Sequence, residues 1–166
     1  MKLILQMMML LVLMAGCGDS TPPPPFVSGR EGQKILPVNF LKSDSTYATV
    51  DTASAHPAIL FYITTECPYC KAELSSLLKN ADSLGNTHVY LLTNSKLAEI
   101  REYEKDFKLD QYRKNFTMGI DTGFVMIKYF GIHAVPYLAV YNKDQILKQA
   151  FNGSVSDKKL REVAAE

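Results

Sequence analysis

The sequence predicts one α/β domain with a mostly parallel central sheet. From about Phe26 onward, short β-rich runs alternate with stretches whose apolar residues follow helical spacing, which is typical of a sheet covered by helices. Residues 58–64 (AILFYIT) are almost continuously apolar, as expected of a strand buried on both faces. The 166 residues, 47% hydrophobic and 21% charged, suit one compact domain with short appendages.

The first half of this domain is expected to contain a hairpin, the buried strand and a helix. Residues 35–40 and 46–50 have the composition of two strands of an N-terminal β-hairpin. After the buried strand, residues 67–81 are expected to be helical, because their apolar side chains recur on one face. That face consists of Ala72, Leu74, Leu77, Leu78 and Ala81.

The second half is expected to alternate strands and helices in the same way. The expected elements are a buried strand at 88–93, an amphipathic helix through Leu97, Ile100, Tyr103 and Phe107, a short helix at 123–130, a hairpin of 137–141 and 145–151 around the turn 142–144, and a final helix through Leu160 and Val163. Ser95 and Ser156 are the expected N-caps, since serine side chains accept backbone N–H groups at helix starts. No repeat and no second domain is evident.

The first 16 residues have the features of a secretory signal. Lys2 precedes an apolar run from Leu3 to Ala15 that only Gln6 interrupts. The run is shorter than the roughly 20 apolar residues of a transmembrane helix, whereas a positive start, a short apolar centre and small terminal residues describe an export signal. The end of the run, residues 13–17 (LMAGC), resembles the lipobox of bacterial lipoproteins, which implies that Cys17 is acylated. The alternative is an ordinary signal peptide with a cysteine near its cleavage site.

Residues 17–29 are expected to be a tether between this lipid and the domain, which spans residues 30–166. Four consecutive prolines, 22–25, follow Gly18 to Thr21 and favour an extended spacer. At about 3 Å per residue, eight residues span roughly 25 Å. We therefore expect a lipid-anchored protein of the bacterial cell envelope that faces the periplasm, with inner and outer membrane both open.

The charge balance excludes one class of partner. The chain has 18 basic and 17 acidic residues and a formal charge of +1, with no basic block, which argues against nucleic-acid binding. We expect a monomer that needs no cofactor.

Two of the three cysteines form a C-x-x-C motif where the buried strand meets the first helix. Thiols at i and i+3 of a helix are close enough to form a disulfide. Cys67 would lie at the helix N-terminus, which favours thiolate over thiol, and Pro68 suits the first turn because it lacks an N–H. Cys67 is thus the expected nucleophile and Cys70 the resolving thiol. A half zinc site, lacking a second ligand pair in the sequence, and a structural staple remain as alternatives.

Two segments resemble those of the thioredoxin superfamily. Residues 61–70 (FYITTECPYC) are similar to its strand-to-active-site segment, and residues 131–136 (GIHAVP) to the segment that carries its cis-proline. With the N-terminal hairpin and residues 70–73 (CKAE), the chain is most similar to the TlpA/ResA-like membrane-tethered thiol oxidoreductases, over about residues 30–166. The resemblance implies a thioredoxin-like fold, a central mixed sheet flanked by helices with an extra N-terminal hairpin, and disulfide exchange with protein partners in the envelope.

The resemblance also implies roles for individual residues. Pro136 would be cis and would pack over the cysteines, although the sequence alone is equally compatible with a trans proline that opens a strand. Pro68 and Tyr69, the two residues between Cys67 and Cys70 in the sequence, would support the active site. The backbone of Val135 would pair with an extended substrate segment. His133 would lie beside the substrate groove.

Acidic residues near the motif could affect the cysteines, and one of them has two interpretations. Glu73 matches an acidic position that tunes the cysteine pair in the ResA-like group, or it is an ordinary solvated helix residue. Glu66 replaces the tryptophan of thioredoxin and would oppose a thiolate at Cys67 if the two lie close. Phe61 stands where thioredoxin has a buried aspartate, which removes that proton route.

One functional alternative belongs to another class. Cys67, Cys70 and His133 could form a copper or zinc site in a metal chaperone on the same fold. Copper-delivering relatives space their cysteines one residue wider, which counts against this alternative, and we expect no metal.

Overall fold

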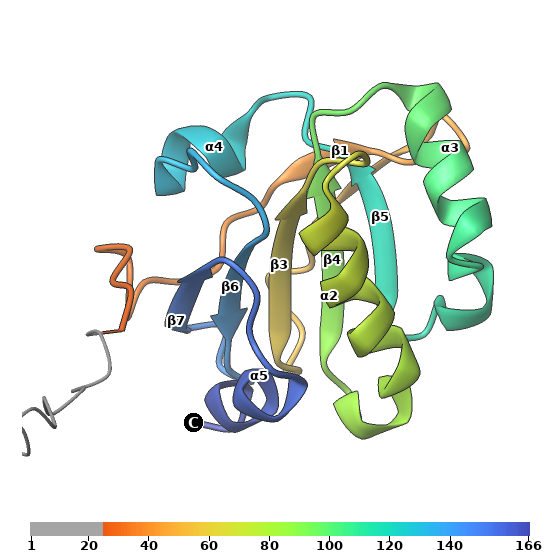
Figure 1. The fold of residues 1–166 in the computed structure, drawn as a ribbon. Coiled ribbons are helices and arrows are strands. Elements are labelled where there is room, and N and C mark those ends of the chain that lie inside the picture. The colour runs from red at the N-terminus through yellow and green to blue at the C-terminus, as the bar shows by residue number, and fades with distance from the viewer. Residues whose placement is uncertain (1–24) are drawn as a thin grey trace, which may run out of the picture.

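A mixed sheet forms the centre of the computed structural model, which describes residues 25–166 (Figure 1). Its strand order is β2-β1-β5-β4-β3-β6-β7. The strands are β1 (Asn39–Leu41), β2 (Tyr47–Thr49), β3 (Ala58–Ile63), β4 (His88–Thr93), β5 (Phe116–Ile120), β6 (Tyr137–Tyr141) and β7 (Leu147–Asn152). The central strands β3, β4 and β5 are parallel, and the outer strands pair antiparallel. The predicted α/β class is confirmed.

Helices cover both faces of the sheet. They are α2 (Pro68–Lys79), α3 (Leu97–Asp106), α4 (Val125–Phe130) and α5 (Asp157–Ala164), with 3-10 turns η2 (Ala81–Leu84) and η3 (Leu109–Tyr112). Side chains of α2, α3 and α5 share one hydrophobic core with the sheet, and α4 packs into the other core with the chain that precedes β1. Among residues 25–166, no helix combines the length and hydrophobicity needed to cross a bilayer.

Strand β3 connects the two cores. All six of its residues are buried, and their side chains alternate between the faces as the pleat requires. Phe61 and Ile63 point into the core under α2, whereas Leu60 and Tyr62 point into the core under α4. This double burial explains the unbroken apolar run in the sequence.

Strand β5 is absent from the sequence-based prediction. Its residues (FTMGI) lack clean alternation and include Gly119, and glycine weakens the strand signal. The structure shows why glycine is needed here: a Cβ on Gly119 would collide with the ring of Phe40 in β1 and lie 3.0 Å from the carbonyl oxygen of Leu41. The strand is therefore fixed by a tertiary contact.

Several predicted element boundaries are corrected. The N-terminal hairpin is shorter than expected, and Ile35 and Val38 are buried without belonging to a strand. The prediction of Ser95 as the N-cap of α3 is wrong, because the N-cap is Lys96, whose N–H is accepted by Glu99. Ser156 is confirmed as the N-cap of α5.

The apolar face predicted for α2 is also corrected. Leu74, Leu77 and Leu78 are buried, but Ala72 is exposed and Glu73 is buried. The carboxyl group of Glu73 therefore lies in the core, whereas the neighbouring Ala72, which was expected there, does not.

The predicted signal peptide (1–16), the predicted lipidation site Cys17 and most of the predicted linker lie outside the described residues. Phe26 of the predicted linker contacts the domain, because its ring meets that of Tyr137 edge-on at 5.9 Å. Arg30, the first residue of the predicted domain, lies 4.4 Å over the ring of Tyr129. The chain thus approaches the sheet beside α4 and the start of β6.

Candidate active site

The two cysteines lie where β3 passes into α2, as the sequence predicts. Cys67 is the N-cap of α2, and its Sγ accepts the N–H of Cys70 at 3.1 Å. Pro68 follows as the first helical residue, where no N–H is needed. The sulfur of Cys67 therefore takes the capping role usually filled by an oxygen.

The pair forms a disulfide in the structure, with the two Cα atoms 5.2 Å apart. Cys67 is partly exposed and Cys70 is fully buried. An incoming thiol or disulfide can thus reach Cys67 but not Cys70. When the pair is reduced, the amide of Cys70 and the helix N-terminus favour a thiolate at Cys67.

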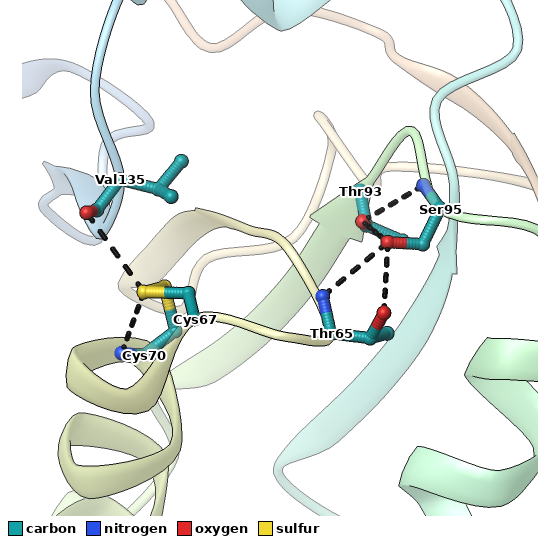
Figure 2. The surroundings of a disulfide bond; sticks show 6 residues. All are labelled: Thr65, Cys67, Cys70, Thr93, Ser95 and Val135. Atoms are coloured by element: carbon teal, nitrogen blue, oxygen red, sulfur yellow. Dashed lines mark hydrogen bonds between the residues drawn. A yellow bond between two sulfur atoms is a disulfide. The ribbon is translucent and has the colours of Figure 1, made fainter.

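The proline segment lies directly beside this disulfide. The Val135–Pro136 peptide bond is cis, and the carbonyl oxygen of Val135 lies 3.9 Å from Sγ of Cys67 (Figure 2). Pro136 is buried, and its carbonyl accepts the N–H of Gly153 at 2.8 Å. Two segments separated by more than sixty residues in the sequence thereby form one surface.

A cluster of three hydroxyl groups holds the turn that precedes Cys67. Oγ of Ser95 accepts the N–H of Thr65 at 3.3 Å and lies 3.1 Å from Oγ1 of Thr65. The same oxygen lies 3.0 Å from Oγ1 of Thr93, which accepts the N–H of Ser95. Figure 2 shows this cluster joining the end of β4 to the active-site turn. No sequence pattern indicates this cluster, because Thr65 lies 30 residues from Ser95 and none of the three residues belongs to a distinctive motif.

The acidic residues near the motif have opposite environments. Glu66 is exposed, so solvent screens its charge from Cys67. Glu73 is only 5% exposed, and the interpretation as a solvated helix residue is wrong. Its Oε2 accepts the N–H of Val155 at 3.2 Å. Burial, with a smaller effect of the Asp157 charge, raises the pKa of Glu73 above its ordinary value.

The remaining predicted site residues lie at the surface. Tyr69 is 70% exposed and His133 is also exposed. In the part of the chain that the structure describes, no three His, Cys, Asp or Glu side chains form a group able to hold a metal. The ligand set Cys67, Cys70 and His133 is therefore not assembled.

Comparison with known proteins identifies the fold. No protein-family model and no curated protein matches the sequence. A secreted Mycobacterium tuberculosis disulfide oxidoreductase, homologous to E. coli DsbE, superposes with a TM-score of 0.60 at 19% identity, covering 76% of this chain and 93% of its own.

Two further solved structures have the same architecture. StoA from Bacillus subtilis gives a TM-score of 0.55 at 18% identity, over 77% of this chain and 97% of its own. The thioredoxin domain of a thiol-disulfide oxidoreductase from Bacteroides vulgatus gives 0.62 at 10% identity, over 80% and 93%. The mixed sheet and these superpositions together show that the chain has the thioredoxin-like fold.

Proposed function

We propose that the protein is a thiol:disulfide oxidoreductase that exchanges disulfides with protein partners through Cys67 and Cys70. The observation that carries this proposal is the placement of Cys67 at the N-terminus of α2, partly exposed and 3.9 Å from the Val135 carbonyl, with Cys70 buried behind it. The structurally similar proteins include disulfide oxidoreductases, which supports the same chemistry here.

The exchange proceeds in two displacements. In the reduced pair, the thiolate of Cys67 attacks one sulfur of the partner disulfide, which forms a mixed disulfide and releases the other partner sulfur as a thiolate. The Cys70 thiolate then attacks Sγ of Cys67, which forms the Cys67–Cys70 disulfide and releases the second partner sulfur. The partner gains two electrons and the cysteine pair loses them. The reverse sequence oxidises the partner.

The surrounding residues supply the substrate surface. The backbone of Val135 offers its carbonyl to an extended partner segment, in the manner of an added strand. Buried Pro136 and the exposed Pro68–Tyr69 dipeptide would shape the surface around the sulfur, and exposed His133, three residues before Pro136, would lie at its edge. A pocket of about 620 Å³, lined by residues that include Arg101 and Glu104, contains none of these residues. The partly exposed Sγ of Cys67 beside the Val135 carbonyl suits an extended protein segment.

The proposal extends to location. A cleaved signal of residues 1–16 and a lipid on Cys17 would hold the domain at the cell envelope, and the secreted similar protein is in keeping with export. Radiolabelled palmitate should be incorporated into the native chain and not into Cys17→Ser. Label in both or in neither would refute lipidation at this residue.

Trapping of the mixed disulfide tests the mechanism. The reduced Cys70→Ser variant, incubated with cell-envelope extract and quenched with acid, should accumulate a covalent adduct that dithiothreitol releases. The matched control, Cys67→Ser, retains a thiol that is buried and should give no adduct. Absence of an adduct in Cys70→Ser, or equal adducts in both variants, would overturn the proposed mechanism.

A further inference from the structure

A pocket opens beside β5, away from the cysteines. Strand β1 pairs with β5 at one position only, Leu41 with Ile120, so the turn after β1 diverges from β5 and leaves a gap between this turn, α3, η3 and β5. Figure 1 shows α3 and β5 side by side. The pocket has a volume of about 620 Å³, which lies within the roughly 300–1,000 Å³ of small-molecule sites.

The inner wall of this pocket is apolar. Leu109, Phe116 and Met118 line it and belong to the core that the sheet shares with α2 and α3. Their exposed fractions are only 5%, 3% and 2%, so they form the deepest part of the pocket. An apolar group that displaces water from this wall gains hydrophobic free energy.

The other lining residues give the pocket an excess of positive charge. Basic residues outnumber acidic ones by four to three. Two of the three acids already have partners, because Asp44 forms a salt bridge with Lys42 at 3.1 Å and Glu104 accepts the hydroxyl of Ser43. The third acid, Asp110, is exposed.

The remaining bases of the pocket, Arg101, Lys105 and Arg113, are in no salt bridge within residues 25–166. Arg101 and Lys105 are four residues apart in α3, and like charges at this spacing repel each other. Arg101 is held in place, because its Nε donates to the carbonyl of Ser43 at 2.8 Å and its Nη2 donates to Oγ of Ser45 at 3.1 Å. These bonds use two of the five N–H donors of a guanidinium. An anion between these bases would relieve the repulsion and accept hydrogen bonds.

We propose that this pocket binds a small organic anion, in which one negatively charged group is attached to an apolar chain or ring. The charged group lies among Arg101, Lys105 and Arg113, and the apolar part lies against the inner wall. The pocket contains neither cysteine and no residue of the proposed partner surface. The proposal therefore does not depend on disulfide exchange.

Fluorescence of anilinonaphthalene sulfonate tests this proposal, because the probe joins a sulfonate to aromatic rings and becomes fluorescent on apolar surfaces. The folded, oxidised native protein should bind the probe saturably, with one molecule per chain. Added salt should weaken binding, since it screens the charges at the rim of the pocket.

Variants locate the bound probe. Lys105→Gln and Arg113→Gln each remove an exposed base of the pocket and should weaken binding roughly fivefold, as expected for the loss of a partly exposed ion pair. Neither side chain belongs to the core, so both variants should fold. The matched control, Lys143→Gln, removes an exposed base from the turn between β6 and β7, outside the pocket, and should bind the probe as the native protein does.

Competition distinguishes the two parts of the ligand. Decanoate, which has a carboxylate and an apolar chain, should displace the probe. Decanol lacks the charge and sulfate lacks the apolar chain, so both should displace the probe only at much higher concentrations.

Three outcomes would overturn the proposal. The first is the absence of saturable probe binding to the native protein, and the second is binding to Lys105→Gln and Arg113→Gln that equals native binding. The third is displacement by decanol or by sulfate at the same concentration as decanoate. Failure to trap a mixed disulfide in Cys70→Ser would instead refute the disulfide exchange alone.

Discussion

Removal of the Ser95 hydroxyl should loosen the turn that carries Cys67. In Ser95→Ala, the N–H of Thr65 and the hydroxyl of Thr93 both lose the oxygen that they meet at 3.3 and 3.0 Å. Thr65 is 8% exposed and Thr93 is fully buried, so solvent replaces these partners poorly. A buried polar group left without its partner costs about 1–3 kcal/mol.

The size of this stability loss follows from the hydrogen bonds that remain in Ser95→Ala. Thr93 still accepts the N–H of residue 95, and the hydroxyl of Thr65 can turn toward solvent, so the cost should fall near the centre of the range, at about 2 kcal/mol. For a domain of this size the midpoint of thermal unfolding should fall by about 4–8 °C. Because Cys67 follows Thr65 by two residues, the rate of its alkylation by iodoacetamide should change as well.

Urea denaturation and the alkylation rate measure these two effects. The control is Ser75→Ala, which removes an exposed hydroxyl bonded to Lys71 within α2 and should change stability by less than about 0.5 kcal/mol. A loss in Ser95→Ala no larger than that of the control would refute the idea that the cluster holds the turn. If stability falls by the expected amount and the alkylation rate is unchanged, the cluster supports the fold without positioning Cys67.

Other substitutions test the packing, the capping and the buried acid. Gly119→Ala should lose about 1–3 kcal/mol in urea denaturation, because its methyl group would overlap the Phe40 ring; an unchanged midpoint would contradict this. Ser156→Ala should cost about 1 kcal/mol by loss of the cap on α5, and stability equal to the native protein would refute the capping role. The folded-state pKa of Glu73 is raised above 4.5, so its contribution is full below that pH and is lost as pH rises through the folded value. Glu73→Gln should remove this part of the decline between acidic and neutral pH, and a stability–pH curve parallel to that of the native protein would contradict the prediction.

The chemistry of the site could be predicted from local sequence. Cys67 and Cys70 are three residues apart at the junction of a buried strand and a helix, and that spacing alone brings two sulfurs together at a helix N-terminus. Ser156 was found for the same reason, since a cap is a local feature. The residues that hold the turn before Cys67 could not be predicted from local sequence. Thr65, Thr93 and Ser95 meet only when β3 and β4 pair side by side.

The environments of the acids also depended on the tertiary structure. The sequence left Glu73 open as a tuning acid or a solvated helix residue, but only the packing of the chain between β7 and α5 buries its carboxyl, which accepts the N–H of Val155. The same holds for β5, whose glycine weakens the local signal and is required by a ring from another strand.

Fold class, central strand and reactive pair could therefore be inferred from local patterns, because each is encoded by periodicity or spacing within a few residues. The partners of those residues could not: packing sets which carbonyl lies beside Cys67, which hydroxyls hold its turn and which amide binds Glu73. Such contacts join segments tens of residues apart. Their existence depends on strand order and helix packing, which no local pattern specifies.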